Sequence, residues 1–495
     1  MKPDNRKIVI VGGGIAGLCT AVYAQKCGYQ VEVLEMHEAP GGLATSWQRG
    51  GYTFETCLNW LLGSNPAGDM YRQWKEVFDI EKLRFVHHEE FVRIENDKGD
   101  SLRIYSNLDQ LESEMLKRAP QERKEIHRFI SSVRHLCTFK LPDPAKSWLG
   151  NWRSLLSDAP HLLLFEQLAK MTCAEYGMRF QDPLLRAFFM DGDSERLSAL
   201  ALFFSLAWMH NHDAEYPIGG SQAVIRLIVE KLLSLGGQLR CGAMVEKILV
   251  EQDVAVGVQL ATGEKIAADW VISAADGHAT IYDLLQGRYK NSDTDKIYRE
   301  LEPFSSYVQV SLGVARDLSQ QPGFLVRLLD KPLQVDPGTL VSRVSFRIFN
   351  YDPTFAPQGK TAITCFLPTR DFEYWLDLQR RDPAAYQAEK QRIADEIIAL
   401  LGRQVANIED AVEVVDVSTP ATVIRYTGNW KGSMEGWLIT PQTGFRQLTN
   451  TLSGLDKFVM VGQWVMPGGG LPAGLMTARS AINTICEHDN MVFAA

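Results

Sequence analysis

The fold is decided by Lys7-Ile-Val-Ile-Val-Gly-Gly-Gly-Ile-Ala-Gly-Leu-Cys-Thr-Ala21 and, shortly after it, by Val31-Glu-Val-Leu-Glu35. The pattern predicts a buried strand, a glycine turn, a helix and a second strand that ends in an acid. The glycines of the turn fit the fingerprint G-x-G-x-x-G at Gly12, Gly14 and Gly17. A lone fingerprint is weak, but this one lies inside a complete strand–turn–helix–strand–acid unit, which predicts dinucleotide binding.

Each part of this unit has a mechanical role. Gly12 permits the tight turn, Gly14 lets the backbone approach a pyrophosphate, and Gly17 lets the helix pack closely on the strand. The start of the helix offers free N–H groups and a positive dipole end to the phosphates. Glu35 lies 18 residues beyond Gly17, where its carboxylate can accept hydrogen bonds from ribose hydroxyls.

Composition narrows the class of protein. The chain has 495 residues, of which 45% are hydrophobic and 22% charged, as in an ordinary globular protein with room for two domains. A formal net charge of −9 argues against a nucleic-acid partner. The eight cysteines contain no C-x-x-C pair, which predicts a reducing compartment and neither a disulfide framework nor a zinc site.

Targeting signals are not evident, and we expect a cytoplasmic protein. The first strand begins within ten residues of Met1, which leaves no room for a signal peptide. The longest nearly apolar run, 197–209, is shorter than the roughly 20 residues that a bilayer requires. Peripheral membrane association stays open, because 148–171 combines two tryptophans with a leucine-rich run. Such a segment either covers a core or rests on a membrane.

The pattern along the chain predicts an α/β fold with a nucleotide-binding domain in three pieces. Strand-like and glycine-rich segments of one style occur in 1–85, 215–300 and 451–495. The segments 86–214 and 301–450 have a different sequence pattern, and we expect them to form an α+β substrate domain. In the last piece we expect a short strand at 458–462, a turn over 467–474 and a helix from Met476.

These three pieces resemble the FAD-dependent amine oxidase and phytoene desaturase superfamily, and within it the phytoene desaturase, carotenoid isomerase and retinol saturase branch. The first match is the glycine fingerprint with Glu35 and Pro40-Gly41-Gly42. The others are Tyr216-Pro-Ile-Gly-Gly220 with Val245-Glu-Lys-Ile248 and Val271-Ile-Ser-Ala-Ala275, and finally Val461-Gly-Gln-Trp-Val-Met-Pro-Gly-Gly-Gly-Leu-Pro-Ala-Gly474. The resemblance implies a discontinuous Rossmann-like FAD-binding domain and an α+β substrate domain.

The resemblance also implies which residues hold FAD. The set comprises Gly12, Gly14, Ile15, Ala16 and Gly17 at the pyrophosphate, Glu35 at the ribose, Gly41, Gly42 and Leu43 along the diphosphate and ribityl chain, Val245 at the adenine, and Gly462, Gln463, Gly474 and Leu475 near the ribityl chain and ring. Two positions depart from the family pattern. Leu43 stands where a basic residue is frequent, and Gln463 where aspartate is frequent. The chain has a single fingerprint, so no stable NAD(P) site is expected.

Candidate catalytic residues are weaker. By its alignment with the family, 56–60 passes near the flavin, which makes Cys57, Asn59 and Trp60 candidate lining residues; an inert buried thiol is the commoner role for Cys57. Trp464 either stacks near the ring or packs in a core. Arg425 and Tyr426 either orient a polar substrate end or belong to a surface loop. The group 210–213 contains two histidines and an aspartate without a distant third partner, so no metal site is predicted.

Four functions follow from the resemblance. The leading one is an FAD-dependent oxidoreductase that desaturates or saturates carbon–carbon bonds of a small hydrophobic, polyene-like lipid. The alternative is a redox-neutral cis/trans isomerase of a polyene that uses reduced FAD. A flavin-holding lipid carrier without activity and an amine oxidase are further alternatives. No catalytic acid or base is evident from the sequence.

Overall fold

The computed structural model describes residues 6–139, 159–190, 192–444 and 448–495. Of the segment 148–171, Trp148 and Trp152 lie outside the described residues, and the part from Ala159 to Ala169 forms helix α6. Within the described residues, no helix combines the length and the apolar character that crossing a membrane would require.

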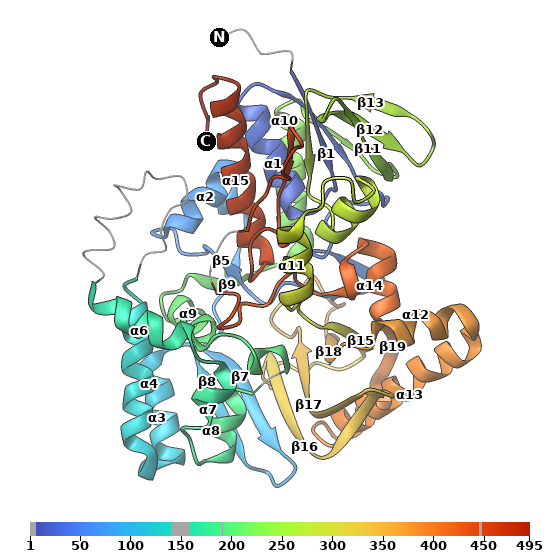
Figure 1. Ribbon diagram of the computed structural model, residues 1–495. Helices are drawn as coiled ribbons and strands as arrows, with labels where there is room; N and C mark the ends of the chain where they lie inside the picture. Colours follow the sequence, from blue (N-terminus) through green and yellow to red (C-terminus); the bar gives the residue numbers. More distant parts are fainter. Residues whose placement is uncertain (1–5, 140–158, 191, 445–447) are drawn as a thin grey trace.

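A five-stranded parallel sheet organises the part of the chain that carries the glycine fingerprint. Its strand order is β10-β2-β1-β14-β20, and every neighbouring pair is parallel. The strands are β1 (Lys7–Val11), β2 (Gln30–Leu34), β10 (Gln238–Arg240), β14 (Trp270–Ser273) and β20 (Phe458–Met460). The sheet therefore joins segments from the beginning, the middle and the end of the sequence. Figure 1 shows them together in the upper half of the molecule.

Both faces of this sheet are covered, which explains why its strands are continuously apolar. Alternate residues of β1 point to opposite faces. Ile8 and Ile10 pack against the helices, whereas Val9 and Val11 pack against a three-stranded antiparallel sheet on the other face. The helices are α1 (Ile15–Lys26), α2 (Asp69–Val77), α10 (Gly220–Ser234) and α15 (Gly470–His488), and the strands are β11 (Val245–Glu251), β12 (Val254–Leu260) and β13 (Lys265–Ala267).

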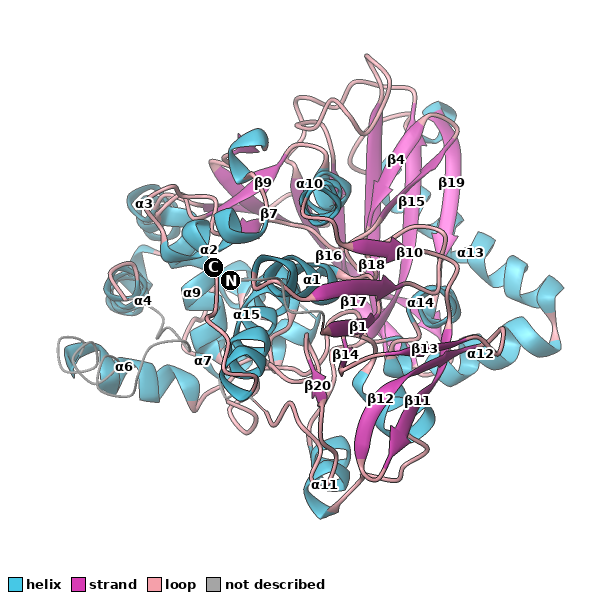
Figure 2. Cartoon of the chain, turned by 90° about the horizontal axis from the view of Figure 1, so that it is seen from above, coloured by secondary structure: helices cyan, strands magenta, loops and turns pink. Residues whose placement is uncertain are grey.

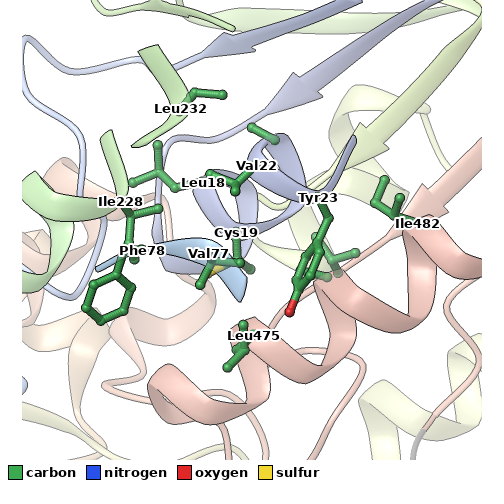
Figure 3. Close-up of a cluster of buried hydrophobic side chains, with 14 of the residues drawn as sticks. Leu18, Cys19, Val22, Tyr23, Val77, Phe78, Ile228, Leu232, Leu475 and Ile482 are labelled. Carbon is green, nitrogen blue, oxygen red and sulfur yellow. The ribbon is translucent and has the colours of Figure 1, made fainter. Parts of the chain in front are cut away.

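Helix α1 is the centre of the larger apolar core. All residues from Ala16 to Ala24 are buried, so this helix has no solvent-facing stripe. Figure 3 shows Leu18, Val22 and Tyr23 of α1 between side chains of α10 and α15. Burial on all sides is why the helix is apolar all round instead of amphipathic.

A seven-stranded mixed sheet forms the lower half of the molecule in Figure 1. Its order is β19-β15-β18-β17-β16-β7-β8, antiparallel throughout except for the parallel pair β16 and β7. The strands are β7 (Glu90–Asn96), β8 (Ser101–Tyr105), β15 (Ser306–Val314), β16 (Phe324–Asp336), β17 (Thr339–Ile348), β18 (Thr361–Thr369) and β19 (Val412–Ser418). The sheet thus combines strands from 86–214 and from 301–450, the two segments expected to form the substrate domain.

Two groups of helices flank this sheet, one beside β7 and β8 and the other beside β19 (Figure 2). The first group is α3 (Leu108–Arg118), α4 (Arg123–Leu136), α6, α7 (Cys173–Gly177), α8 (Pro183–Phe188) and α9 (Ala199–His210). The second group is α12 (Phe372–Arg381), α13 (Pro383–Gly402) and α14 (Pro420–Thr427).

Smaller elements connect the two halves. They are the hairpin β3 (Ser46–Arg49) and β4 (Tyr52–Glu55), the three-stranded sheet of β5 (Leu61–Leu62), β9 (Ala214–Pro217) and β6 (Phe85–Val86), helix α11 (Ser292–Glu300) and a π-helical turn over Ala279–Leu284. Short 3-10 turns occupy Ile80–Lys82, Pro120–Glu122, Gly192–Glu195, Glu409–Ala411 and Trp430–Gly432.

The α/β class and the Rossmann-like parallel sheet are confirmed, and two local expectations need correction. The last helix begins at Gly470, six residues before the expected Met476, because Pro472 sits in its first turn, where a missing N–H costs nothing. Strand β16, which contains Pro332, lies in a stretch where no strand was expected. The pairing of β16 with β17 is irregular between Leu328 and Leu333, around this proline.

Candidate active site

The glycine turn between β1 and α1 is shaped for a close approach of another group. Gly12 has φ +100°, and a Cβ at Gly17 would overlap the carbonyl oxygen of Gly12. Gly14 is the N-cap of α1 and has no side chain to satisfy the first amides of the helix. Free amides and a positive dipole end at this point make an anion-binding site.

Glu35 lies beside this turn, at the end of β2. Its Oε2 accepts a hydrogen bond from the Gly13 N–H at 2.8 Å, and its Oε1 accepts one from the His37 N–H at 2.9 Å. The Glu35 carbonyl accepts a further bond from Ala243 N–H at 2.8 Å, which brings the start of β11 at Val245 to the same side. The residues assigned to the adenosine end of a dinucleotide therefore lie together.

Two more glycine segments meet the start of α1. Gly41 N–H donates to Gly13 O at 2.9 Å, and Gly14 and Gly41 form an isolated parallel bridge. From the C-terminal segment, a Cβ at Gly474 would lie 2.8 Å from Ile15 Cγ2, and one at Gly462 would lie 3.2 Å from Ala16 Cβ. The absence of side chains thus leaves a cradle around the first turn of α1, which fits a dinucleotide.

The remaining members of the predicted cofactor set take different environments. Leu43 lines the cavity described below. Gln463 donates through Nε2 to Asn429 Oδ1 at 3.2 Å, and Leu475 is fully buried in the core around α1. The role of each residue toward the cofactor stays a prediction.

A cavity of about 860 Å³, whose wall includes Leu43 next to the cradle, extends into the second half of the molecule. At one end it reaches the glycine turn before α15, at Gly468, Gly469 and Gly470, and it continues between β17 and the helices around α9. Its wall is predominantly apolar, with aromatic residues that include Trp60, Phe91, Phe188, Phe204, Trp208, Tyr307 and Phe324. A pocket of this size and character suits an apolar ligand.

The loop 56–60 lines the cavity as the sequence indicated. Cys57, Asn59 and Trp60 all face it, and the Trp60 ring meets Phe91 edge-on at 5.6 Å between centroids. Burial raises the pKa of the Cys57 thiol well above its usual range. A protonated thiol is a poor nucleophile, which favours the inert role for Cys57; its part in catalysis stays a prediction to be tested.

Two other candidates lie away from the cavity wall. Trp464 is buried in a cluster with Trp437 and Leu301, and its Nε1 donates to Asn429 Oδ1 at 3.3 Å. This arrangement corresponds to the alternative in which Trp464 packs in a core. Tyr426 is exposed; its ring lies 5.0 Å from that of His37, and the central carbon of the Arg425 guanidinium lies 4.6 Å from the centre of the Tyr426 ring. This position near the end of β2 does not support a role for Tyr426 or Arg425 at a reacting bond.

Glu435 was not recognised from the sequence, although it stands inside the aromatic-rich stretch before the C-terminal motif. Its carboxyl lines the cavity and fills the room that Gly469 and Gly470 leave: a Cβ at Gly470 would lie 2.9 Å from Glu435 Oε1. Burial raises the pKa of this carboxyl to about 8. At neutral pH Glu435 is therefore largely protonated and can donate a proton where the cavity meets the glycine turn, whereas only its ionised fraction can accept one.

Within the group 210–213, for which no metal site was predicted, the side chains have separate partners. Asp213 accepts a hydrogen bond from the Asn65 N–H at 3.1 Å. His212 instead lies with His87 and Glu215, and within the described ranges this is the one such group whose donor atoms all fall within 4.8 Å. The pairing of β6 with β9 brings His87 opposite Glu215, and Nδ1 of each histidine lies 3.1–3.3 Å from the same carboxylate oxygen. The contacts of both histidines with Glu215 account for the cluster without a metal, and the absence of a metal stays a prediction.

The fold and the cradle define a dinucleotide-binding enzyme with a large apolar cavity beside the cofactor position. The sequence profile of flavin containing amine oxidoreductases matches residues 15–485. The chain belongs to this family, and its cofactor is FAD.

Relatives and solved structures agree with this assignment. The chain is 25% identical over 496 residues to prolycopene isomerase 2 of an Oncidium hybrid cultivar, covering 95% of this chain and 83% of the relative. It is 23% identical over 516 residues to a 4,4'-diapophytoene desaturase of Methylomonas sp, covering 99% and 97%. Putrescine oxidase with bound putrescine superposes with a TM-score of 0.63 at 15% identity, over 98% of this chain and 99% of that one. The last comparison concerns the fold alone.

Proposed function

We propose that the protein is an FAD-dependent oxidoreductase that desaturates or saturates carbon–carbon bonds of an apolar, polyene-like lipid. The observation that carries this proposal is the predominantly apolar cavity that runs from the glycine turn before α15 to the helices around α9. Relatives named for prolycopene and diapophytoene support a polyene as the substrate class.

In this proposal the three chain segments 1–85, 215–300 and 451–495 form the FAD-binding domain. The amides at the start of α1, together with Gly12, Gly14 and Gly17, bind the pyrophosphate, and Glu35 accepts hydrogen bonds from the ribose. The segments 86–214 and 301–450 form the substrate domain. When bound, FAD supplies hydride or electron transfer, so little acid–base help is required from the protein.

The chain's own residues supply three further elements. Apolar side chains such as Trp60 and Phe204 exclude water from the substrate. Glu55 fixes the loop 56–60, because its carboxylate accepts hydrogen bonds from the N–H groups of Cys57 and Leu58 at 3.2 Å. Glu435 holds a proton at the boundary between the glycine turn and the cavity, where a polyene carbon would gain or lose one.

The alternative is a redox-neutral cis/trans isomerase that requires reduced FAD. It has the same cavity and cofactor, and the match to prolycopene isomerases supports it. The two proposals differ in the products: an isomerase leaves the mass of the polyene unchanged, whereas a desaturase or saturase removes or adds hydrogen.

The experiment has two stages. First, the absorption spectrum of the purified protein, and of the supernatant after denaturation, shows whether FAD and a polyene copurify. Second, the extracted polyene, or a carotenoid supplied in liposomes, is incubated anaerobically with oxidised and with photoreduced protein, and the products are separated and weighed by mass spectrometry. A change in mass supports the oxidoreductase, and a change in retention at constant mass supports the isomerase. Failure to bind added FAD would refute both.

A further inference from the structure

Arg347 places a buried positive charge on the wall of the apolar cavity. It lies near the end of β17, and its side chain is 5% exposed. Side chains two and four residues apart along a strand face the same side of a sheet, and both Arg343 and Arg347 line the cavity. Arg343 donates to the Ala187 carbonyl at 2.8 Å and remains partly exposed.

The guanidinium of Arg347 has few partners. Its Nη1 donates to the Leu58 carbonyl at 3.1 Å, and its buried Nε has no hydrogen-bond partner. Rings of Phe349 and Phe366 lie 5.9 and 5.4 Å from its central carbon. Among the residues that the structure describes, no carboxylate oxygen comes within 4.0 Å of this group.

Arg327 shows how the same chain treats a comparable arginine outside the cavity. Arg327 is 8% exposed and lies on β16, the strand beside β17. It forms ion pairs with Asp97 at 3.0 Å and with Glu95 at 3.8 Å. Its charge is therefore compensated by protein carboxylates, unlike that of Arg347.

The buried acid Glu55 does not compensate the charge of Arg347. Glu55 feels the Arg347 charge, but its oxygens accept hydrogen bonds from Ser221 N–H at 2.9 Å and Ser221 Oγ at 2.6 Å, besides the two amides of the loop 56–60. An arginine cannot shed its proton to relieve burial. A buried, incompletely paired cation therefore favours a ligand that brings an anion.

We propose that Arg347 binds the carboxylate of an apolar chain, so that the physiological ligand of the cavity is a carboxylate-terminated polyene and not a neutral hydrocarbon. A carboxylate matches the single charge and planar donors of a guanidinium, whereas the apolar wall suits the remaining chain. That this ligand reacts in the cavity rests on the proposed function, whereas its binding to Arg347 does not. Anchoring one end near Leu58 would also fix which carbon–carbon bond lies at the glycine turn.

The test compares two probes that differ only at the end group, cis-parinaric acid and its methyl ester. Binding to the FAD-loaded protein is measured by equilibrium dialysis, with each probe quantified after extraction. We expect the wild-type protein to bind the acid about 10- to 100-fold more tightly than the ester, the range expected for hydrogen bonds to a charged group. Equal binding of the acid and the ester would overturn the inference, and this arm needs no variant.

Variants then assign the preference to Arg347. Arg347→Gln should bind acid and ester equally, while Arg347→Lys, which keeps the charge, should retain a smaller preference. Arg226→Gln is the matched control, because Arg226 lies on the exposed face of α10, and it should preserve the wild-type ratio. An unchanged ratio in folded Arg347→Gln would refute the assignment. Binding of the acid without any flavin-dependent turnover would refute the proposed function but leave this inference standing.

Discussion

Replacing Glu435 by glutamine should alter how the stability of the protein depends on pH. Glutamine has nearly the same shape but no proton to lose, so the substitution isolates the ionisation of one carboxyl. In the folded protein the pKa of this carboxyl is raised from 4.5 to about 8, because burial disfavours its charged form. In the unfolded chain the carboxyl returns to its usual pKa.

The sign follows from the number of bound protons. Between pH 4.5 and about pH 8 the folded protein keeps the proton of Glu435 and the unfolded chain has released it. The free energy of unfolding therefore falls as pH rises through this window. Each unit by which the pKa in the folded protein exceeds that in the unfolded chain corresponds to about 1.4 kcal/mol. The loss of stability across the window therefore has a ceiling of about 5 kcal/mol. About two of these units lie between pH 6 and pH 8 and correspond to about 2.7 kcal/mol. Water that enters the cavity reduces this part of the effect, and we expect about 2 kcal/mol between pH 6 and pH 9.

Two measurements check this expectation. Urea unfolding at pH 6 and pH 9, at a fixed excess of FAD, should show that wild-type protein loses about 2 kcal/mol more than Glu435→Gln over this interval. Infrared difference spectra at neutral pH should contain a protonated-carboxyl band that the variant lacks. Glu251→Gln, at an exposed position at the end of β11, serves as the control. Parallel pH dependences of wild type and Glu435→Gln, with no carboxyl band, would refute the assignment of Glu435 as a proton-holding group.

Three further outcomes are expected. Gly17→Ala should abolish FAD retention, measured as the ratio of flavin to protein absorbance, because its Cβ would overlap Gly12 O; a normal ratio would contradict the cradle. Cys57→Ser should change the turnover rate less than about tenfold, since burial keeps the thiol protonated, and a larger loss would restore Cys57 as a catalytic candidate. Glu55→Ala should lower the free energy of unfolding by about 2–4 kcal/mol in urea titrations, because Ser221 and the loop 56–60 lose buried hydrogen bonds. A loss below about 1 kcal/mol would show that water replaces these bonds.

The parallel sheet could be predicted because its signals are local. The fingerprint at 12–17 and the apolar runs of β1 and β14 identify strands and turns within a few residues. The start of α15 was misjudged because proline and glycine usually end helices, whereas Pro472 lies in a first turn. Local sequence rules do not distinguish a proline that follows the end of a helix from a proline in the first turn of a helix.

The candidate site could be predicted where a residue has a backbone role, and at the loop 56–60 through its alignment with the family. Glycines of the cradle are recognisable because their positions demand the absence of a side chain. Glu435 and Arg347 are single charged residues in ordinary surroundings of the sequence, and their significance arises from burial and from missing partners. Both properties depend on elements far apart in the chain, so neither residue could be identified from spacing.

The parallel sheet also has a consequence for synthesis on the ribosome. Strand β20 pairs with β14, and α15 packs against α1 (Figure 3), so the final segment of the polypeptide completes a core that the first segment begins. The cradle around α1 stays open until residues 458–488 have been translated. We therefore expect nascent chains to capture the cofactor only once residues 458–488 have left the ribosome, and chains that stop before β20 to be degraded by proteases.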